Sequence, residues 1–225
     1  MEESVMKLKE SLKKQGLKGL TLDIDETLAD TSPHWWNHML KFHKPDSDLT
    51  IQELVEKYQY IEHVPGWHTE EARNHIKNAL DSDEFNEAVP LLHESNKMVE
   101  KLQKIVPIVA YITARPEKVR KGTENWLIKH GFPKAPIILR PTESSIQDLE
   151  TKNHWKAGVL KHLYPEVIGI VDDNSGLPPE LLKEKYEGKL FLYGERTKEI
   201  NTKDYSFPVI ISPDWNHVID HFNSK

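Results

Sequence analysis

The sequence predicts an α/β fold: a three-layer core with a parallel sheet between helices, plus a small all-helical segment inserted after the first strand. Short apolar runs suited to buried strands, such as 107–113 and 167–171, alternate with segments of helical periodicity. This alternation is typical of parallel strands joined by right-handed helical crossovers. Between residues 31 and 96 strand-like alternation is absent, so several helices are expected there instead.

The predicted core begins with a helix and a short strand. Residues 2–15 place Val5, Leu8 and Leu12 on one apolar stripe of a charged helix. Residues 20–22 are apolar or β-branched, which suits a buried parallel strand. The remaining core is expected to have strands at 107–113, 136–139, 167–171, 190–193 and 209–211, and helices at 94–104, 116–130, 153–163 and 213–222.

The inserted segment contains several signals for helix starts. Ser32 followed by Pro33 is one of them, and further helices are expected at 49–60, at 69–80 and at 82–88. We therefore expect two domains with hinges near Pro33 and Pro90. They are an α/β core, residues 1–30 and 97–225, and a helical cap, residues 31–96.

Polar side chains stand where three of the predicted strands end. Asp23 and Asp25 follow the first strand, Thr113 ends the second, and Asp172 with Asp173 ends the strand at 167–171. Residues two apart in an extended chain point to the same side, so Asp23 and Asp25 can face one site. In a parallel sheet all these ends lie at one edge, where α/β proteins bind ligands. Crowded carboxylates repel, and a divalent cation would offset that repulsion.

Composition bounds the classes of function. The chain has 225 residues, 37% hydrophobic and 29% charged, with a formal net charge of −6, which argues against a general nucleic-acid binder. It has no cysteine, so disulfide and thiolate chemistry are excluded and a cytoplasmic location is expected. No apolar run suggests a signal peptide or a membrane span. The oligomeric state is not predicted.

Four motifs, in order, resemble those of the haloacid dehalogenase-like (HAD) superfamily of phosphatases. The run D-I-D-E-T at 23–27 is similar to the first motif, and the apolar strand ending in Thr113, followed by 114–116, to the second. A lysine near a helix start before the strand at 167–171 would be the third, and Asp172–Asp173 resembles the fourth. The resemblance covers roughly residues 17–31 and 105–195. It implies a Rossmann-like core, and residues 31–96 lie where the family carries its cap.

The resemblance implies a Mg²⁺-dependent phosphatase acting through an aspartyl-phosphate. Asp23 would be the nucleophile, and Asp25 would protonate the leaving oxygen and then deprotonate the attacking water. Mg²⁺ would be held by the Asp23 carboxylate, the Asp25 backbone carbonyl and Asp172. Asp173 would act through a water molecule or by orienting the lysine.

The same resemblance implies a phosphate-binding group around the second and third motifs. The Thr113 hydroxyl and the backbone N–H of Ala114 would hold phosphate oxygens, and the lysine would neutralise charge on the phosphoryl group. Lys152 and Lys156 both precede the last of these strands. We favour Lys156, because a position within a helix holds a side chain better than a position at its start.

The substrate is expected to be a small phosphate monoester, with a nucleotide as the leading candidate and the 5′-nucleotidases as a similar subgroup. Trp35 and Trp36 could form an aromatic wall that stacks on a base, although helix-borne aromatics more often pack within their own domain. Arg115 could guide an anionic substrate or pair with an acid on the surface. Glu26 stands where many family members have glycine, which blurs the choice of subfamily.

Other readings remain open. The chain could be a phosphatase for nucleic-acid ends or a phosphotransferase, although net negative charge disfavours long nucleic acids as partners. It could also be a non-catalytic phosphate-binding module, although binding alone would not need Asp25. Each motif also has a structural reading, since Asp favours turns and Thr favours strands.

Overall fold

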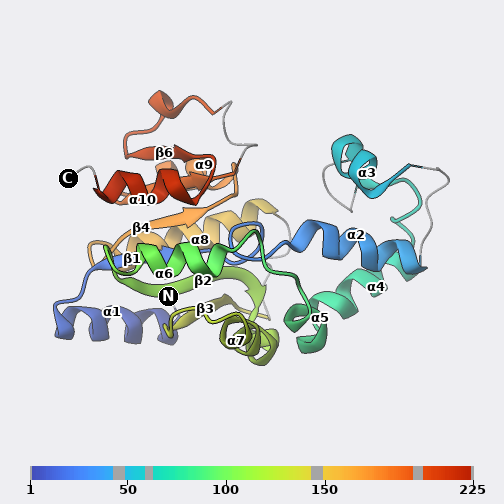
Figure 1. Cartoon of the computed structure of the whole chain (residues 1–225), viewed down its shortest axis with the longest axis horizontal. Helices are drawn as coiled ribbons and strands as arrows, with labels where there is room; N and C mark the ends of the chain where they lie inside the picture. Colours follow the sequence, from blue (N-terminus) through green and yellow to red (C-terminus); the bar gives the residue numbers. More distant parts are fainter. Residues whose placement is uncertain (1, 43–48, 59–62, 143–148, 195–199, 224–225) are drawn as a thin grey trace.

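The computed structural model describes residues 2–42, 49–58, 63–142, 149–194 and 200–223. Its centre is a six-stranded, fully parallel sheet with the strand order β3-β2-β1-β4-β5-β6 (Figure 1). The predicted α/β class is therefore confirmed. The strands are β1 Gly19–Leu22, β2 Ile108–Pro116, β3 Ile137–Arg140, β4 Val167–Asp172, β5 Lys189–Tyr193 and β6 Val209–Ser212.

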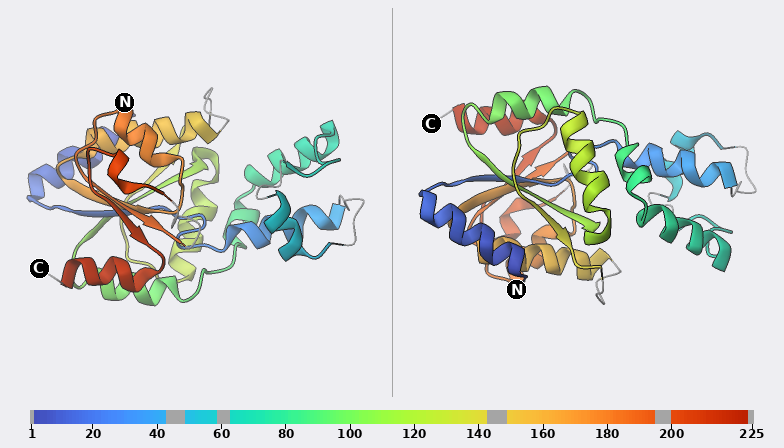
Figure 2. Two further views of the ribbon diagram at one scale, coloured as in Figure 1. Left: turned by 90° about the horizontal axis from the view of Figure 1, so that it is seen from above. Right: turned by 90° about the horizontal axis from the view of Figure 1, so that it is seen from below.

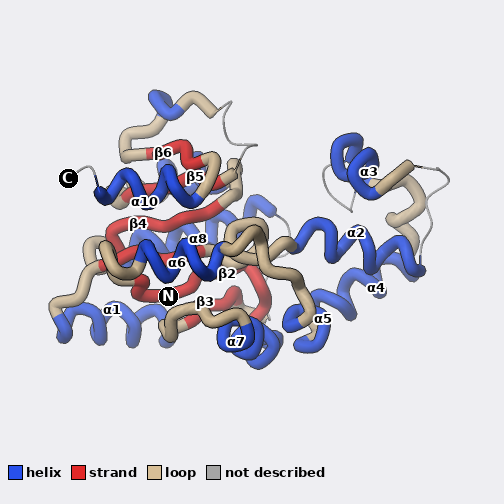
Figure 3. Tube along the Cα trace, viewed as in Figure 1, coloured by secondary structure: helices blue, strands red, loops and turns tan. Residues whose placement is uncertain are grey.

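Helices cover both faces of the sheet, as Figures 2 and 3 show. Each face has its own buried apolar cluster, because the strands present apolar side chains to both sides. On one face lie α1 (Glu3–Gln15), α8 (Leu149–Leu163) and α9 (Leu177–Lys183); on the other lie α6 (Ser95–Leu102), α7 (Arg120–Lys129) and α10 (Trp215–Asn223). A short 3₁₀ turn, η4 (Thr202–Asp204), precedes β6.

Strand β1 lies at the point where the order in which strands are added to the sheet reverses. The chain passes from β1 outward to β2 and β3, then returns to the other side of β1 with β4. The carboxyl ends of β1 and β4 therefore form a topological switch point, the place where open α/β sheets bind ligands. Gly19 begins β1 because a side chain would not fit there: an added Cβ would lie 2.2 Å from the Pro107 carbonyl oxygen.

Four helices lie beyond the carboxyl ends of the strands, on the right in Figure 1: α2 (Thr31–Phe42), α3 (Ile51–Tyr58), α4 (Glu70–Leu80) and α5 (Asp83–Glu87). The first three share a separate apolar cluster that includes Trp36, Leu54 and Ala72. The predicted helix at 49–60 ends partly outside the described residues. A separate cluster is what a cap domain requires, but the division into core and cap at the stated boundaries stays a prediction.

Helix α5 packs against α7 of the core. The Gly122 N–H donates to Asp83 Oδ1 at 2.6 Å, and Asn125 Nδ2 donates to Glu87 Oε2 at 2.9 Å. An added Cβ on Gly122 would lie 2.3 Å from the Asp83 carbonyl oxygen, so the two helices touch through backbone. This contact connects the end of the inserted segment to the sheet.

Two predicted helix starts differ from the structure by four residues. Pro116 was expected to begin a helix, but it is extended (φ −71°, ψ 149°) and pairs with Arg140 at the end of β2. A 3₁₀ turn, η2 (Glu117–Val119), then leads into α7. Helix α8 begins at Leu149 rather than at Asn153, because its polar first turn has no apolar periodicity that the sequence could show.

Candidate active site

An acidic cluster lies at the carboxyl edge of the sheet, at the ends of β1 and β4. Asp23, Asp172 and Asp173 each offer a carboxylate oxygen, and these atoms lie within 4.8 Å of one another. The two strands hold the cluster together directly, because the Asp23 N–H donates to the Val171 carbonyl at 2.9 Å. The side chains of Asp23 and Asp172 are buried, and that of Asp173 is partly exposed. Ile24 turns into the core and is fully buried.

Lys156 lies between two of these acids. Its Nζ is 3.0 Å from Asp23 Oδ1 and 2.7 Å from Asp172 Oδ2, and its side chain is 4% exposed. The residue sits in the middle of α8, which packs beneath β4. Lys152 lies one turn earlier on the same helix. Of the two candidate lysines, Lys156 is the one whose ammonium lies against Asp23 and Asp172.

The charges in this cluster do not balance. Burial raises the pKa of Asp23 to about 7, and Asp172 and Asp25 add to the effect against the opposing charge of Lys156. Burial, Asp172 and Asp23 likewise raise the pKa of Asp173 well above its usual range. The pKa of Lys156 is raised despite its burial, because Asp172 and Asp23 stabilise the ammonium. Carboxylate oxygens in excess of nearby cations fit a hard divalent cation such as Mg²⁺.

Asp25 has a different environment from that of Asp23. Arg115 donates to it from Nε, at 3.1 Å to Oδ1 and 3.0 Å to Oδ2, and from Nη2 at 2.7 Å to Oδ1. Thr31 Oγ1 also donates to Oδ1, at 2.7 Å. Burial alone would raise the pKa of Asp25, but Arg115 and Thr31 outweigh it and the pKa is lowered. Of the two roles expected for Arg115, guiding an anionic substrate or pairing with an acid, the structure shows the pairing. The acid is Asp25 in the candidate site, not a residue on the open surface.

The loop after Asp23 is a tight turn. The N–H groups of Leu28 and Ala29 both donate to the Ile24 carbonyl, at 2.8 and 2.9 Å. Glu26 has φ 56°, in the left-handed region that favours glycine. This explains why glycine suits the position. The Glu26 carboxylate accepts from the Ser32 N–H at the start of α2, which offsets part of the strain.

Thr113 and Ala114 lie within β2, which pairs with β1. The Thr113 side chain is fully buried, and its Oγ1 accepts from the Arg115 N–H at 3.2 Å. The Ala114 carbonyl accepts from Arg140 Nε at 2.8 Å. Both residues lie near the carboxyl ends of the parallel strands, the position that the resemblance implies for the second motif.

An asparagine pair fixes the loop after β4, and the sequence analysis did not identify it. The Asn174 N–H donates to Asp172 Oδ1 at 2.9 Å, and its side-chain amide donates to Asn153 Oδ1 at 2.9 Å. Asn153 is on α8, three residues before Lys156. One face of this helix therefore carries both the asparagine that holds Asn174 and the lysine that pairs with Asp23 and Asp172. That i, i+3 spacing was a signal that the sequence did contain.

The two tryptophans at the start of the inserted segment have different environments. Trp36 is 1% exposed and its ring lies 5.3 Å from that of Trp67, so it packs within the helical cluster. Trp35 is partly exposed, and its ring lies 4.5 Å from that of Phe85 on α5. Trp35 is thus the better placed of the two for contact with a ligand.

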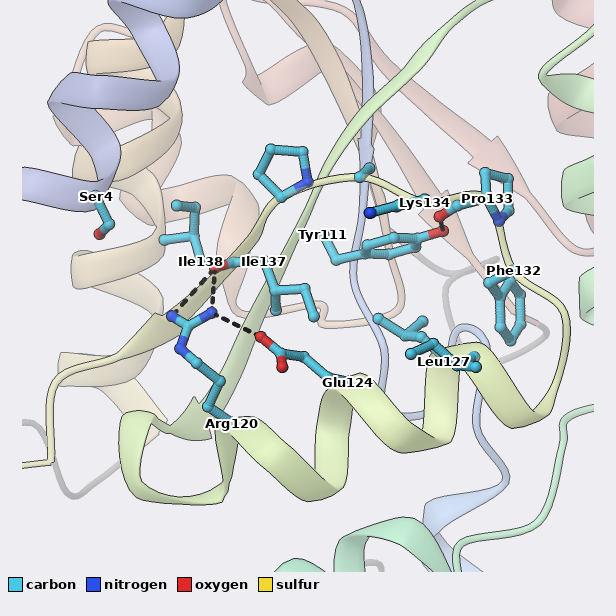
Figure 4. Close-up of a pocket in the computed structure, with 13 residues that line it drawn as sticks. Ser4, Tyr111, Arg120, Glu124, Leu127, Phe132, Pro133, Lys134, Ile137 and Ile138 are labelled. Carbon is cyan, nitrogen blue, oxygen red and sulfur yellow. Dashed lines mark hydrogen bonds and ion pairs between the residues drawn. The ribbon is translucent and has the colours of Figure 1, made fainter.

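A cavity of about 690 Å³ lies elsewhere, along α7 and the beginning of β3 (Figure 4). Its apolar side includes Leu127, Phe132 and Ile137, and Arg120 crosses one end to reach the Ile137 carbonyl and Glu124. The described residues that line it include no member of the acidic cluster. Its position therefore separates it from the candidate active site.

No protein-family model matches the chain. A curated relative from Bacillus cereus, named "Putative nucleotidase", is 27% identical over 115 residues. The match covers 49% of this chain and 58% of that relative, so it spans little more than half of the relative's length.

Similar solved structures are described as HAD-superfamily proteins. A HAD-superfamily hydrolase from Ehrlichia chaffeensis has a TM-score of 0.48 at 15% identity, covering 92% of this chain and 98% of that one. A HAD family hydrolase from Deinococcus radiodurans, solved with bound phosphate and sodium, has a TM-score of 0.49 at 9% identity, with coverages of 90% and 93%. The HAD domain of the effector Lem4 from Legionella pneumophila has a TM-score of 0.41 at 16% identity, with coverages of 92% and 94%.

Proposed function

We propose that this protein is a HAD-type phosphatase that hydrolyses a small phosphate monoester, with a nucleotide as the leading candidate. The observation that carries the proposal is Lys156, buried and bonded to both Asp23 and Asp172 at the switch point of the sheet. A buried lysine between acids is costly as a purely structural device, and such networks cluster at functional sites. The partial similarity to a "Putative nucleotidase" supports the nucleotide as substrate.

The residues present fit a divalent cation. The carboxylates of Asp23, Asp172 and Asp173 would hold it, together with the Asp25 backbone carbonyl that the resemblance implies. The resemblance implies an indirect role for Asp173, through a water molecule or by orienting the lysine. We propose it as a ligand instead, because its carboxylate oxygen lies within 4.8 Å of those of Asp23 and Asp172. Within the described part of the chain only Thr27 Oγ1, at 3.5 Å, donates to it. When bound, Mg²⁺ would neutralise charge on the phosphoryl group.

Asp23 would act as the nucleophile. Its ionised carboxylate, which Lys156 favours from 3.0 Å, attacks phosphorus, and the bond from phosphorus to the ester oxygen breaks. Asp25 would give a proton to that leaving oxygen, a role that requires it to bind a proton against the pKa-lowering effect of Arg115 and Thr31. Asp25 then takes a proton from water, which attacks the aspartyl-phosphate and frees Asp23. The Thr113 hydroxyl and the Ala114 N–H are proposed to hold phosphate oxygens.

The helices at 31–96 are proposed as the cap that encloses the substrate and limits access of water. None of the helices in the described residues combines the length and apolarity needed to cross a membrane. The cytoplasmic location stays a prediction.

Phosphate release from a panel of nucleoside monophosphates and p-nitrophenyl phosphate, with and without Mg²⁺, tests the proposal. Asp23→Asn should lower kcat by more than about 10³-fold with an unchanged circular dichroism spectrum, because the amide cannot attack phosphorus. Asp204→Asn, at an exposed position in η4, is the matched control and should retain full activity. Absence of turnover across metals and pH would instead favour a non-catalytic module.

A further inference from the structure

The side-chain amides of Asn153 and Asn174 bond to each other in both directions. Asn174 Nδ2 donates to Asn153 Oδ1 at 2.9 Å, and Asn153 Nδ2 donates to Asn174 Oδ1 at 3.4 Å. Asn174 Oδ1 also accepts from the Gly176 N–H at 2.8 Å, which closes the turn after β4. Asn153 is only 4% exposed, and a buried amide needs such partners. Helix α8 therefore holds this turn through the Asn153 side chain.

Gly176 fits against Asn153 because it has no side chain. An added Cβ would lie 2.6 Å from Asn153 Nδ2 and 3.2 Å from Asn174 Oδ1. The φ of Gly176 is −85°, which any residue adopts, so the close approach explains the glycine. The next residue, Leu177, is fully buried, and its N–H donates to the Asn174 carbonyl at 3.0 Å. The turn is thus fixed by Asn153 at its start and by the buried first residue of α9 at its end.

The turn sets the orientation of the Asp172 carboxylate. The Asn174 N–H donates to Asp172 Oδ1 at 2.9 Å, and Lys156 Nζ donates to Oδ2 at 2.7 Å. One contact therefore comes from α8 directly, and the other depends on Asn153, three residues before Lys156 on the same helix. A carboxylate held at both oxygens cannot rotate without losing a hydrogen bond. Each oxygen has one donor among the described residues and can accept about two bonds, so each keeps a lone pair for a cation.

We propose that Asn153 is a positioning residue for the divalent cation: by holding the turn at 174–176, it fixes the orientation of Asp172 and the place of Asp173. This inference rests on the cation site of the proposed function. Asp173 lies between Asp172 and Asn174 in the chain, so a shift of the turn would also shift its carboxylate. Groups that orient metal ligands through hydrogen bonds typically change metal affinity by about 10–100-fold. A purely structural link between α8 and the turn would change stability and leave that affinity unaltered.

Isothermal titration calorimetry with Mg²⁺ alone, on protein freed of metal with EDTA and then dialysed, tests the inference without a substrate. Asn153→Ala should raise the Kd for Mg²⁺ by about tenfold or more, with the circular dichroism spectrum of the wild type. Asn174→Ala removes the other half of the pair and should raise the Kd by a similar factor. Asn174 is partly exposed, so this variant provides the same measurement if Asn153→Ala does not fold. Because the two amides act as a pair, the double variant should lose about as much as either single variant.

Asn125→Ala is the matched control. Asn125 is on α7, on the opposite face of the sheet, and its amide donates to Glu87 Oε2 at 2.9 Å. Its loss should lower the Tm measured in EDTA and leave the Kd for Mg²⁺ within about twofold of the wild-type value.

Two results would overturn the inference alone. One is an Asn153→Ala variant that has a lower Tm but binds Mg²⁺ as tightly as the wild type. The other is a double variant whose loss of affinity is the product of the two single losses. If the wild-type protein binds no Mg²⁺, the proposed cation site itself fails, and the role of Asn153 fails with it.

Discussion

Replacing Lys156 with methionine removes the one ammonium that the structure places between Asp23 and Asp172 among the described residues. The three side chains are at most 8% exposed, so the two acids would stay buried without their cation. Breaking a buried ion pair from one side costs about 3–5 kcal/mol. An independent route gives a similar value. A carboxyl with an ordinary pKa of about 3.9 that must bind a proton at pH 7 costs about 4 kcal/mol at 1.36 kcal/mol per pH unit.

The sign of the pH dependence follows from the same acids. A carboxyl whose pKa is higher in the folded state adds stability at low pH and loses it as the pH rises through that value. Asp23 is already such a carboxyl in the wild-type protein, because burial raises its pKa to about 7. The deficit of Lys156→Met should therefore be largest near pH 7 and shrink as the pH falls toward about 4, where the unfolded chain also binds the proton.

Urea unfolding followed by circular dichroism, with EDTA present, measures this deficit at pH 7 and at pH 4.5. A loss of about 4 kcal/mol corresponds to a lowering of Tm by about 8–16 °C in a chain of this size. Lys161→Met is the matched control, because Lys161 is on the same helix but 37% exposed, and it should cost less than about 1 kcal/mol. A deficit below about 1 kcal/mol for Lys156→Met at pH 7, or one that does not shrink at pH 4.5, would refute the reasoning.

Three further predictions concern substrate, packing and metal. Trp35→Ala should raise KM for nucleoside monophosphates about tenfold more than for p-nitrophenyl phosphate, since stacking on a base is worth about 1–3 kcal/mol; steady-state kinetics showing an equal rise would exclude stacking. Gly122→Ala should lower the free energy of unfolding by about 1–3 kcal/mol, because its Cβ would meet the Asp83 carbonyl at 2.3 Å. Gly158→Ala on α8, with no neighbour within 4 Å, should raise it by about 0.5–1 kcal/mol; urea titrations that failed to separate the two variants would contradict the packing of α5 on α7. Mg²⁺ at about 100 times its Kd should add about 2.7 kcal/mol, a Tm increase of about 5–10 °C after EDTA treatment, and Asp173→Asn should reduce that increase. A thermal melt unaffected by Mg²⁺ would argue against the cation site.

The sequence alone could predict the order of the strands and the strand ends on which the acids stand, but it did not predict α9 (Leu177–Lys183) between β4 and β5. Apolar runs and helical periodicity are local signals, and the rule that parallel strands end at one edge then brings separate residues together. For this reason the sequence predicts that Asp23, Asp172 and Asp173 lie near one another. The preference for Lys156 over Lys152 also came from a local argument, its place within a helix.

The partners of Asp25 depend on tertiary structure. Arg115 is 90 residues away along the chain, and its meeting with Asp25 follows from the pairing of β1 with β2 and the packing of α5 on α7. Periodicity carries no information on such contacts, because it records which face is buried and not what that face meets. Only the folded chain could therefore show that Asp25 pairs with Arg115, whereas Asp23 shares the Lys156 ammonium with Asp172. The burial of Trp36 and the partial exposure of Trp35 also depend on how the helices pack against one another. The sequence predicts these helices but not their arrangement in space.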